Sequence, residues 1–263
     1  MTLVWRPGFQ FDDDASTYIE AVEAADTQAL ETGVRYAIND FVIGCKNDGI
    51  WDAIKVSCIL AGARTLNGAL VPLVGTAPTN YNFVSGDYDR ETGLVGDGST
   101  KYLDSNRLRT ADPRNSFHSA VAVSQLGTTS TVGFYISNGV EASSSATGLS
   151  LIGQNASNNI FTRNTCTNPD TLGTASTGFV GTSRAEASKY TARSGGTDYT
   201  LNQTSENRPS TTTKLYTSRL QNGLPNAMTS SRIRFYSIGE SLDLAALDTR
   251  VSDLITAIGA AIP

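Results

Sequence analysis

Histidine is the scarcest chemically reactive residue type in this chain, since 263 residues contain a single copy, His118. With one histidine and no HExxH or CxxC pattern, a zinc site would lack ligands, so transition-metal chemistry is excluded. His118 lies in an alternating segment that predicts a strand. Its neighbours Ser116 and Ser119 do not build a triad with it, because successive strand side chains point to opposite faces. We therefore expect a partly buried strand histidine.

Cysteine is also sparse, and its three copies, Cys45, Cys58 and Cys166, show no CxxC spacing. An odd count without a secretory signal argues against a disulfide framework, so we expect three reduced, buried side chains. No apolar stretch is long enough to span a bilayer, and no positively charged start precedes an apolar segment. These absences predict a soluble chain without membrane insertion.

Charge is low as well. Charged residues make up 17% of the chain, and the formal net charge is −5. Binding to nucleic acid needs a basic surface that neutralises phosphates, so this balance argues against a nucleic-acid partner. Abundant Ser, Thr, Asn and Gly are typical of the exposed strands and turns of β-rich proteins.

Helical periodicity is confined to the two ends of the chain. Asp12 and the two aspartates after it supply a helix cap, and apolar residues at helical spacing follow them. A second helix is predicted over residues 29–46, closed by Asn47-Asp48-Gly49. The last helix is predicted to begin with Ser241 as N-cap. Its buried stripe is expected to contain Leu244, Leu247, Val251, Leu254 and Ile258.

Between these ends, short strand patterns recur at the spacing of an all-β domain. In residues 117–123 the alternation places Phe117, Val121 and Val123 on one face of a strand whose other face is also weakly polar, as in a central strand. The candidate strands lie around residue 94 and at residues 101–104, 117–124, 132–137, 149–153, 159–163, 178–182, 188–193, 197–201, 212–217 and 232–238. They are sufficient for two packed sheets.

Two segments read as the first and last strands of one β-sandwich. Residues 93–106 contain the Asp97-Gly98 turn followed by a polar/apolar strand. In residues 232–242, Ile233 and Phe235 are expected on one face, with Arg234 and Tyr236 on the other. Both segments resemble the concanavalin-like, laminin-G-type jelly-roll domains of bacteriophage virion proteins. Residues 41–54 and 74–80 resemble the same phage group, and the similarity runs from about Asp12 to the C-terminus.

The resemblance implies a non-enzymatic structural protein of a tailed-phage virion, made in the host cytoplasm. It would be displayed on the head as a decoration or on the tail as an adhesion module. Its partners would be other virion proteins and further copies of itself, for which a trimer is the expectation. A host-glycan-binding, lectin-like receptor-binding protein is the alternative, and a glycan depolymerase is a third. The absence of coiled-coil heptads and repeats argues against an independent fibre.

The expected fold is an antiparallel β-sandwich of the jelly-roll type with an N-terminal helical hairpin and a C-terminal helix. The organisation is an N-terminal arm over residues 1–11, a helical region and connector over residues 12–80, a sandwich over residues 81–241 and a helix over residues 242–263. One composite domain of this size can bury its own core. In the arm, Trp5, Phe9 and Phe11 are candidate contacts to another subunit or to the virion, together with the apolar helix faces.

Several carboxylates are candidates for chemistry. Glycoside hydrolysis needs a carboxylate pair, and the nearest pattern is the run of residues 87–91, Asp-Tyr-Asp-Arg-Glu, which a solvated loop explains better. Asp97, Asp104 and Asp198 are candidate calcium donors, although none lies in a dense ligand motif. No cofactor is therefore expected. Glycan binding would use an aromatic platform with amide donors, supplied by Tyr190, Tyr199, Tyr216, Asn202 and Gln203.

Overall fold

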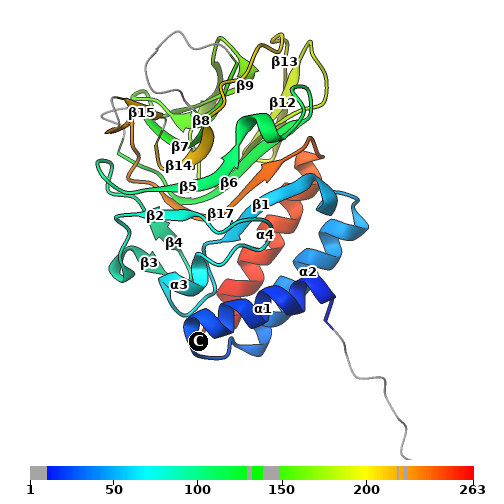
Figure 1. Ribbon diagram of the computed structural model, residues 1–263, viewed down its shortest axis with the longest axis vertical. Coiled ribbons are helices and arrows are strands. Elements are labelled where there is room, and N and C mark those ends of the chain that lie inside the picture. The colour runs from blue at the N-terminus through cyan, green and yellow to red at the C-terminus, as the bar shows by residue number, and fades with distance from the viewer. Residues whose placement is uncertain (1–10, 129–131, 139–147, 218, 222–223) are drawn as a thin grey trace, which may run out of the picture.

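The computed structural model arranges the chain in three layers (Figure 1). A helical layer lies against one sheet of a two-sheet β-sandwich, and the second sheet lies on the far side of the first. The expected antiparallel sandwich with N-terminal helices and a C-terminal helix is thus confirmed. The structure describes residues 11–128, 132–138, 148–217, 219–221 and 224–263.

The sheet next to the helices is eight-stranded, and all its pairings are antiparallel. Its order is β13 (Thr197–Leu201), β12 (Tyr190–Ser194), β11 (Gly178–Arg184), β6 (Phe117–Gln125), β17 (Arg232–Gly239), β4 (Gly93–Val95) and β3 (Tyr88–Asp89), and β1 (Ile54–Ile59) also pairs with β17. We call it the inner sheet. The last strand in sequence, β17, is therefore central in this sheet.

The outer sheet is seven-stranded and also antiparallel. Its order is β10 (Asp170–Thr174), β9 (Asn159–Cys166), β8 (Leu149–Gln154), β7 (Gly133–Ser137), β14 (Thr212–Leu215), β5 (Tyr102–Leu108) and β2 (Thr79–Tyr81). A separate hairpin joins β15 (Arg219–Gln221) to β16 (Leu224–Asn226). The predicted boundary between residues 80 and 81 falls within β2, and β1 belongs to the inner sheet, so the connector supplies strands to both sheets.

The helices are α1 (Asp13–Asp26), α2 (Thr32–Asn47), the single turn α3 (Leu66–Ala69) and α4 (Leu244–Ala261), with 3-10 turns η1 (Trp51–Ala53), η2 (Ser85–Asp87) and η3 (Arg109–Ala111). The Asp12 side chain accepts a hydrogen bond from the Asp14 N–H, which confirms the predicted cap of α1. Gly49 follows α2 at φ +68°, a conformation that glycine adopts without strain. None of the helices formed by the described residues is both long and apolar enough to cross a membrane.

The start of α4 corrects the sequence prediction by two residues. The Asp243 carboxylate, not the Ser241 hydroxyl, caps the helix by accepting hydrogen bonds from Ala245 N and Ala246 N at 2.8 and 3.1 Å. Ser241 is instead bound to Ser116, whose hydroxyl accepts its N–H at 3.0 Å. The predicted stripe from Leu244 to Ile258 is buried, and α4 packs on α2 and on β11.

Two large cores hold most of the buried apolar residues, and a third, small cluster contains Cys166, Tyr190 and Ala192. Of the two large cores, one lies between the sheets and the other between the helices and the inner sheet. In β6, Phe117, Val121 and Val123 enter the first core, while Ala120 and Ala122 enter the second, as the alternation predicted. Both faces of this strand are covered, because the outer sheet packs on one face and the helical layer on the other.

The predicted faces of β17 are wrong from Phe235 onward. The pairing of β17 with β6 shifts register between Ile233 and Phe235, which marks a β-bulge. Ile233 lies in the core between the sheets, whereas Phe235 lies in the core under the helices and Tyr236 returns to the first. A bulge adds one residue to the strand, so the period of two that the prediction used does not hold across it.

Residues 93–106 do not form one strand. Gly93 to Val95 pairs with β17 in the inner sheet, and the chain then turns at Asp97 to enter β5 of the outer sheet. The turn is held by the Asp97 carboxylate, which accepts hydrogen bonds from Ser99 N and Thr100 N at 2.8 Å. The two segments thus join the sheets at one corner.

Candidate functional site

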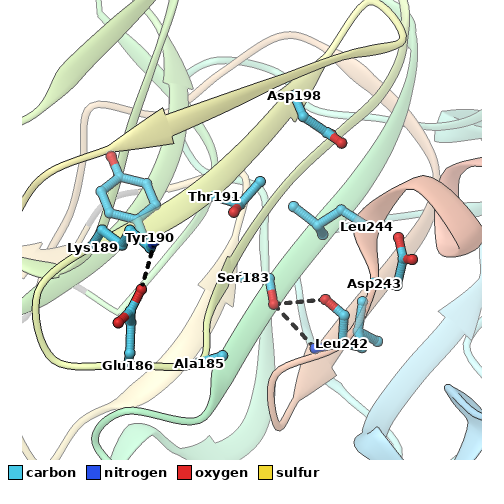
Figure 2. A pocket seen from close by; sticks show the side chains of 10 residues that line it. All are labelled: Ser183, Ala185, Glu186, Lys189, Tyr190, Thr191, Asp198, Leu242, Asp243 and Leu244. Atoms are coloured by element: carbon cyan, nitrogen blue, oxygen red, sulfur yellow. Dashed lines mark hydrogen bonds and ion pairs between the residues drawn. The ribbon is translucent and has the colours of Figure 1, made fainter.

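A pocket of about 330 Å³ lies at the edge of the inner sheet, where α4 begins (Figure 2). We call it the edge pocket. It is lined by Ser183, Ala185, Glu186, Lys189, Tyr190, Thr191, Asp198, Leu242, Asp243 and Leu244. These residues come from β11, the β11–β12 turn, β12, β13 and the start of α4.

The floor of the edge pocket is set by strand register. Ser183 of β11 pairs with Thr191 of β12, which places both side chains on the helix-facing side of the sheet. The Ser183 hydroxyl donates to Leu242 O at 2.8 Å and accepts from Leu242 N at 3.1 Å. This exchange fixes the segment before α4 against β11. No group in the described part of the chain bonds to the Thr191 hydroxyl, so it can bind a ligand.

The carboxylates of Asp243 and Asp198 form two walls of the edge pocket. Asp243 uses Oδ1 to cap α4, and no described group binds its Oδ2. Asp198 accepts from Arg193 Nη1 at 2.8 Å through Oδ1, and Arg193 Nε is paired with Asp248 at 2.8 Å. The guanidinium thus holds Asp198 in place and leaves its second oxygen exposed. Both walls present fixed hydrogen-bond acceptors to the pocket.

An exposed ion pair closes the third side. Lys189 Nζ lies 3.1 Å from Glu186 Oε1, and this hydrogen bond lowers the pKa of Glu186. Among the lining residues three carboxylates therefore face one ammonium group. The edge pocket has an excess of negative charge, which favours the hydroxyl groups of a neutral ligand over an anion.

The structure does not bring the predicted tyrosines together. Tyr190 is 2% exposed, and its hydroxyl bonds to Thr162 and Asp170 between the sheets. Tyr216 is fully buried, and its hydroxyl donates to Leu94 O at 2.6 Å. Aromatic rings enclosed in this way cannot stack on a sugar, so the predicted aromatic platform is wrong.

The other members of the predicted set lie on or near β13. Tyr199 is half-buried, and Asn202 is exposed. Gln203 donates to Asp170 at 3.2 Å. Aromatic and amide side chains are the sequence signal of a glycan site, whereas Ser183, Thr191 and Asp243 belong to no motif. Only the pairing of β11 with β12 and the position of α4 bring them together.

His118 is a core residue. Its Nδ1 lies 2.5 Å from Glu240 O and its Nε2 lies 2.7 Å from the Ser237 hydroxyl, so both ring nitrogens have partners. Burial lowers the pKa of His118 to about 4, which keeps the imidazole neutral near pH 7. The ring is fully buried instead of partly buried as expected. It cannot serve as a base for a solvent-borne substrate.

Two of the three carboxylates of residues 87–91 have structural partners, and the third, Glu91, is exposed. Asp87 pairs with Lys101 at 2.5 Å. Asp89 accepts from Thr92 through its hydroxyl at 2.6 Å and its N–H at 2.7 Å, and these hydrogen bonds lower the pKa of Asp89. The general acid of a glycosidase needs a raised pKa, whereas the pKa of Asp89 is lowered.

The three candidate calcium donors lie in different elements, and each binds a partner of its own. Asp97 holds its turn, Asp104 lies 3.4 Å from Lys214 Nζ, and Asp198 pairs with Arg193. Within the described ranges no group of three His, Cys, Asp or Glu side chains is placed to hold a metal. The three cysteines are free and buried, as predicted.

The proposed attachment surfaces are altered by the fold. The apolar faces of α1, α2 and α4 are buried in the core under the helices, so they are not free to bind a virion partner. Trp5 and Phe9 lie outside the described residues. The Phe11 ring packs on Tyr36 of α2 with ring centroids 5.5 Å apart. The end of the arm is thereby joined to the helical layer.

No protein-family model matches this chain, and no curated protein matches it. A mutant of Trypanosoma rangeli sialidase displaying trans-sialidase activity aligns with a TM-score of 0.50 at 10% identity, over 84% of this chain and 39% of that chain. The Ruminococcus gnavus IT-sialidase CBM40 bound to α2,3-sialyllactose aligns with a TM-score of 0.43 at 11% identity, over 57% of this chain and 85% of that chain. The likeness to the trypanosomal protein supports the β-sandwich fold alone.

Proposed function

We propose that this chain is a non-enzymatic glycan-binding module of a phage virion, and that the edge pocket holds a neutral sugar of a host-surface glycan. The observation that carries the glycan assignment is the set of unused acceptors around Thr191, with Asp198 and Asp243 each fixed by one oxygen and open at the other. Fixed carboxylates are strong acceptors for sugar hydroxyl groups. Leu242 and Ala185 offer the apolar surface that a sugar ring also needs.

The absence of catalysis rests on the titratable groups. His118 is enclosed in the core, and the hydrogen bonds from Thr92 lower the pKa of Asp89, which favours its ionised form. In the edge pocket, the pKa of Glu186 is lowered by Lys189, whereas a general acid needs a raised value. The virion assignment rests on the sequence resemblance.

A glycan array probed with the purified chain tests the proposal. Thr191→Val removes one hydroxyl, and Asp198→Asn removes one charged acceptor, so each is expected to weaken binding of the array hits about tenfold or more, a loss typical of buried polar contacts. Tyr81→Ala is the control, because Tyr81 is the 40%-exposed aromatic stacked on Tyr102 at the edge of the outer sheet.

Loss of binding in Tyr81→Ala with unchanged binding in Thr191→Val would move the site to the outer sheet and refute the edge pocket. Release of reducing ends from a bound polysaccharide by the wild-type chain would refute the non-enzymatic assignment.

Head decoration is the second candidate, and the contact of Phe11 with Tyr36 favours it. That contact fixes Phe11, the last residue of the predicted arm, on the helical layer. Removal of residues 1–11 is then expected to abolish incorporation into virions while leaving glycan binding intact. Normal incorporation of the truncated chain would exclude attachment by the arm.

A further inference from the structure

Arg234 is a half-buried cation without an internal partner. Its Nε is buried and has no hydrogen-bond partner, and no described carboxylate forms an ion pair with its guanidinium. Arg184 shows the usual arrangement for a buried arginine, because its guanidinium donates to five backbone carbonyl oxygens. A partly desolvated guanidinium with open donors is costly unless a ligand supplies the acceptors.

Its place in β17 directs this side chain toward the helices. Because the register shifts between Ile233 and Phe235, Arg234 and Phe235 both lie on the side of the inner sheet that faces the helices. Phe235 enters the core, and Arg234 reaches the gap between the sheet and the C-terminal half of α4. Alternation from Ile233, which lies between the sheets, already places Arg234 on the helix-facing side, and the bulge keeps Phe235 on that same side.

Arg234 lines a pocket of about 260 Å³ that is separate from the edge pocket and that we call the helix–sheet pocket. Its apolar wall is formed by Ala122, Phe179, Val251 and Ile255, and its rim carries hydroxyl groups and Arg234. The rim hydroxyls belong to Ser124, Thr177, Ser252 and Thr256. An apolar wall with one cation at its margin matches a ligand with an apolar body and one negative charge.

The carboxylates nearest to Arg234 do not form an ion pair with it. Burial lowers the pKa of Arg234, while Asp89 and Glu91 act from a distance to raise it. Asp89 is occupied by the turn to Thr92, and Glu91 is exposed. No other cation lines the helix–sheet pocket, so a single charge must be matched there.

We infer that the helix–sheet pocket binds a small organic monocarboxylate, with its carboxylate paired to the Arg234 guanidinium and its apolar body against Phe179 and Ile255. Arginine presents parallel N–H donors that match a carboxylate. A phosphate or nucleotide would bring two or more negative charges to one guanidinium, which the site does not balance. This ligand differs in charge from the neutral sugar of the edge pocket, so the two assignments stand independently.

Benzoate is the probe, and isosteric, uncharged benzamide is its matched control. In NMR titrations of the wild-type chain that follow the Arg234 Nε–Hε signal, benzoate is expected to saturate at a concentration at least tenfold below that of benzamide. Arg234→Gln is expected to weaken benzoate binding at least tenfold, measured by saturation-transfer or calorimetric titration. Ile255→Trp, which fills the apolar wall, is expected to do the same with Arg234 in place.

Arg234→Gln removes no internal ion pair, so the variant is expected to keep the near-ultraviolet circular dichroism of the wild type. Equal responses to benzoate and benzamide, or unchanged benzoate binding in both variants, would overturn the proposal. An Arg234–Glu91 ion pair in an experimental structure, with benzoate affinity unaffected by Glu91→Gln, would also overturn it. Thr191→Val in the edge pocket is expected to leave benzoate binding unchanged, which separates this result from the glycan assignment.

Discussion

Phe41 of α2 and Phe235 of β17 meet edge to face, with ring centroids 5.7 Å apart and an interplanar angle of 64°. Both rings are 2% exposed or less. The contact joins the helical layer to the central strand of the inner sheet, and it exists because the bulge turns Phe235 toward the helices. Edge-to-face aromatic pairs stabilise a core beyond the area that they bury.

Phe235→Ala is expected to lower the free energy of unfolding by about 3 to 5 kcal/mol, because it leaves a cavity beneath α2. Urea denaturation followed by circular dichroism measures the change. Ile43→Ala on α2 is the control, since the Ile43 side chain is 36% exposed. It should lower the free energy of unfolding by well under half as much. Equal costs would mean that the Phe41–Phe235 contact does not anchor the helical layer.

His118 should make stability depend on pH in the mildly acid range. Its pKa is about 4 in the fold and about 6.5 when unfolded, so the unfolded chain binds the extra proton between these values. Stability due to this residue is complete above pH 6.5 and is lost as pH falls toward 4, by up to about 3 kcal/mol. Comparison of the wild type with His118→Gln by denaturation at pH 7, 5.5 and 4.5 measures it. An unchanged slope in the variant would assign the acid sensitivity to carboxylates.

Removal of the α4 cap should have a moderate effect. Asp243→Ala is expected to cost about 1 kcal/mol, since two N–H groups lose their acceptor. Ser241→Ala should cost less, because Ser241 loses only a hydroxyl contact to Ser116. Thermal denaturation of both variants measures the two losses of stability. A larger loss for Ser241→Ala would favour the cap predicted from sequence.

The three thiols should be inert in the native state. Burial raises the pKa of Cys45 and Cys58 to about 12 and also raises the pKa of Cys166. Since the thiolate is the reactive form, a disulfide reagent at pH 8 is expected to label no cysteine until guanidinium chloride unfolds the chain, when three react. Rapid labelling of one thiol in the native protein would contradict its burial.

Local patterns predicted the elements well. Caps and periodicity found α1, α2 and α4 to within three residues, because these signals lie within a few positions of one another. Alternation in residues 117–123 gave both faces of β6. It failed at Phe235, where the bulge adds a residue, and it could not detect β2 and β3, which are too short to show a period.

The candidate sites were far less predictable. Tyr216 and Tyr190 have the composition of a glycan platform, and their enclosure depends on which sheet covers them. Thr191 and Asp243 become neighbours only when β12 pairs with β11 and α4 packs on the inner sheet. Arg234 appeared in the sequence as one polar residue in an alternating strand.

By itself the sequence determined the β-sandwich class, the helical ends and the unpaired cysteines, since composition and local periodicity encode them. Only the tertiary structure decided that β17 is central, that residues 93–106 divide between two sheets and that Arg234 faces α4. Those features depend on pairings between residues more than 100 positions apart, such as Ile233 with Val123 and with Leu94. A bulge and a long-range register leave no local signal that a single sequence can reveal.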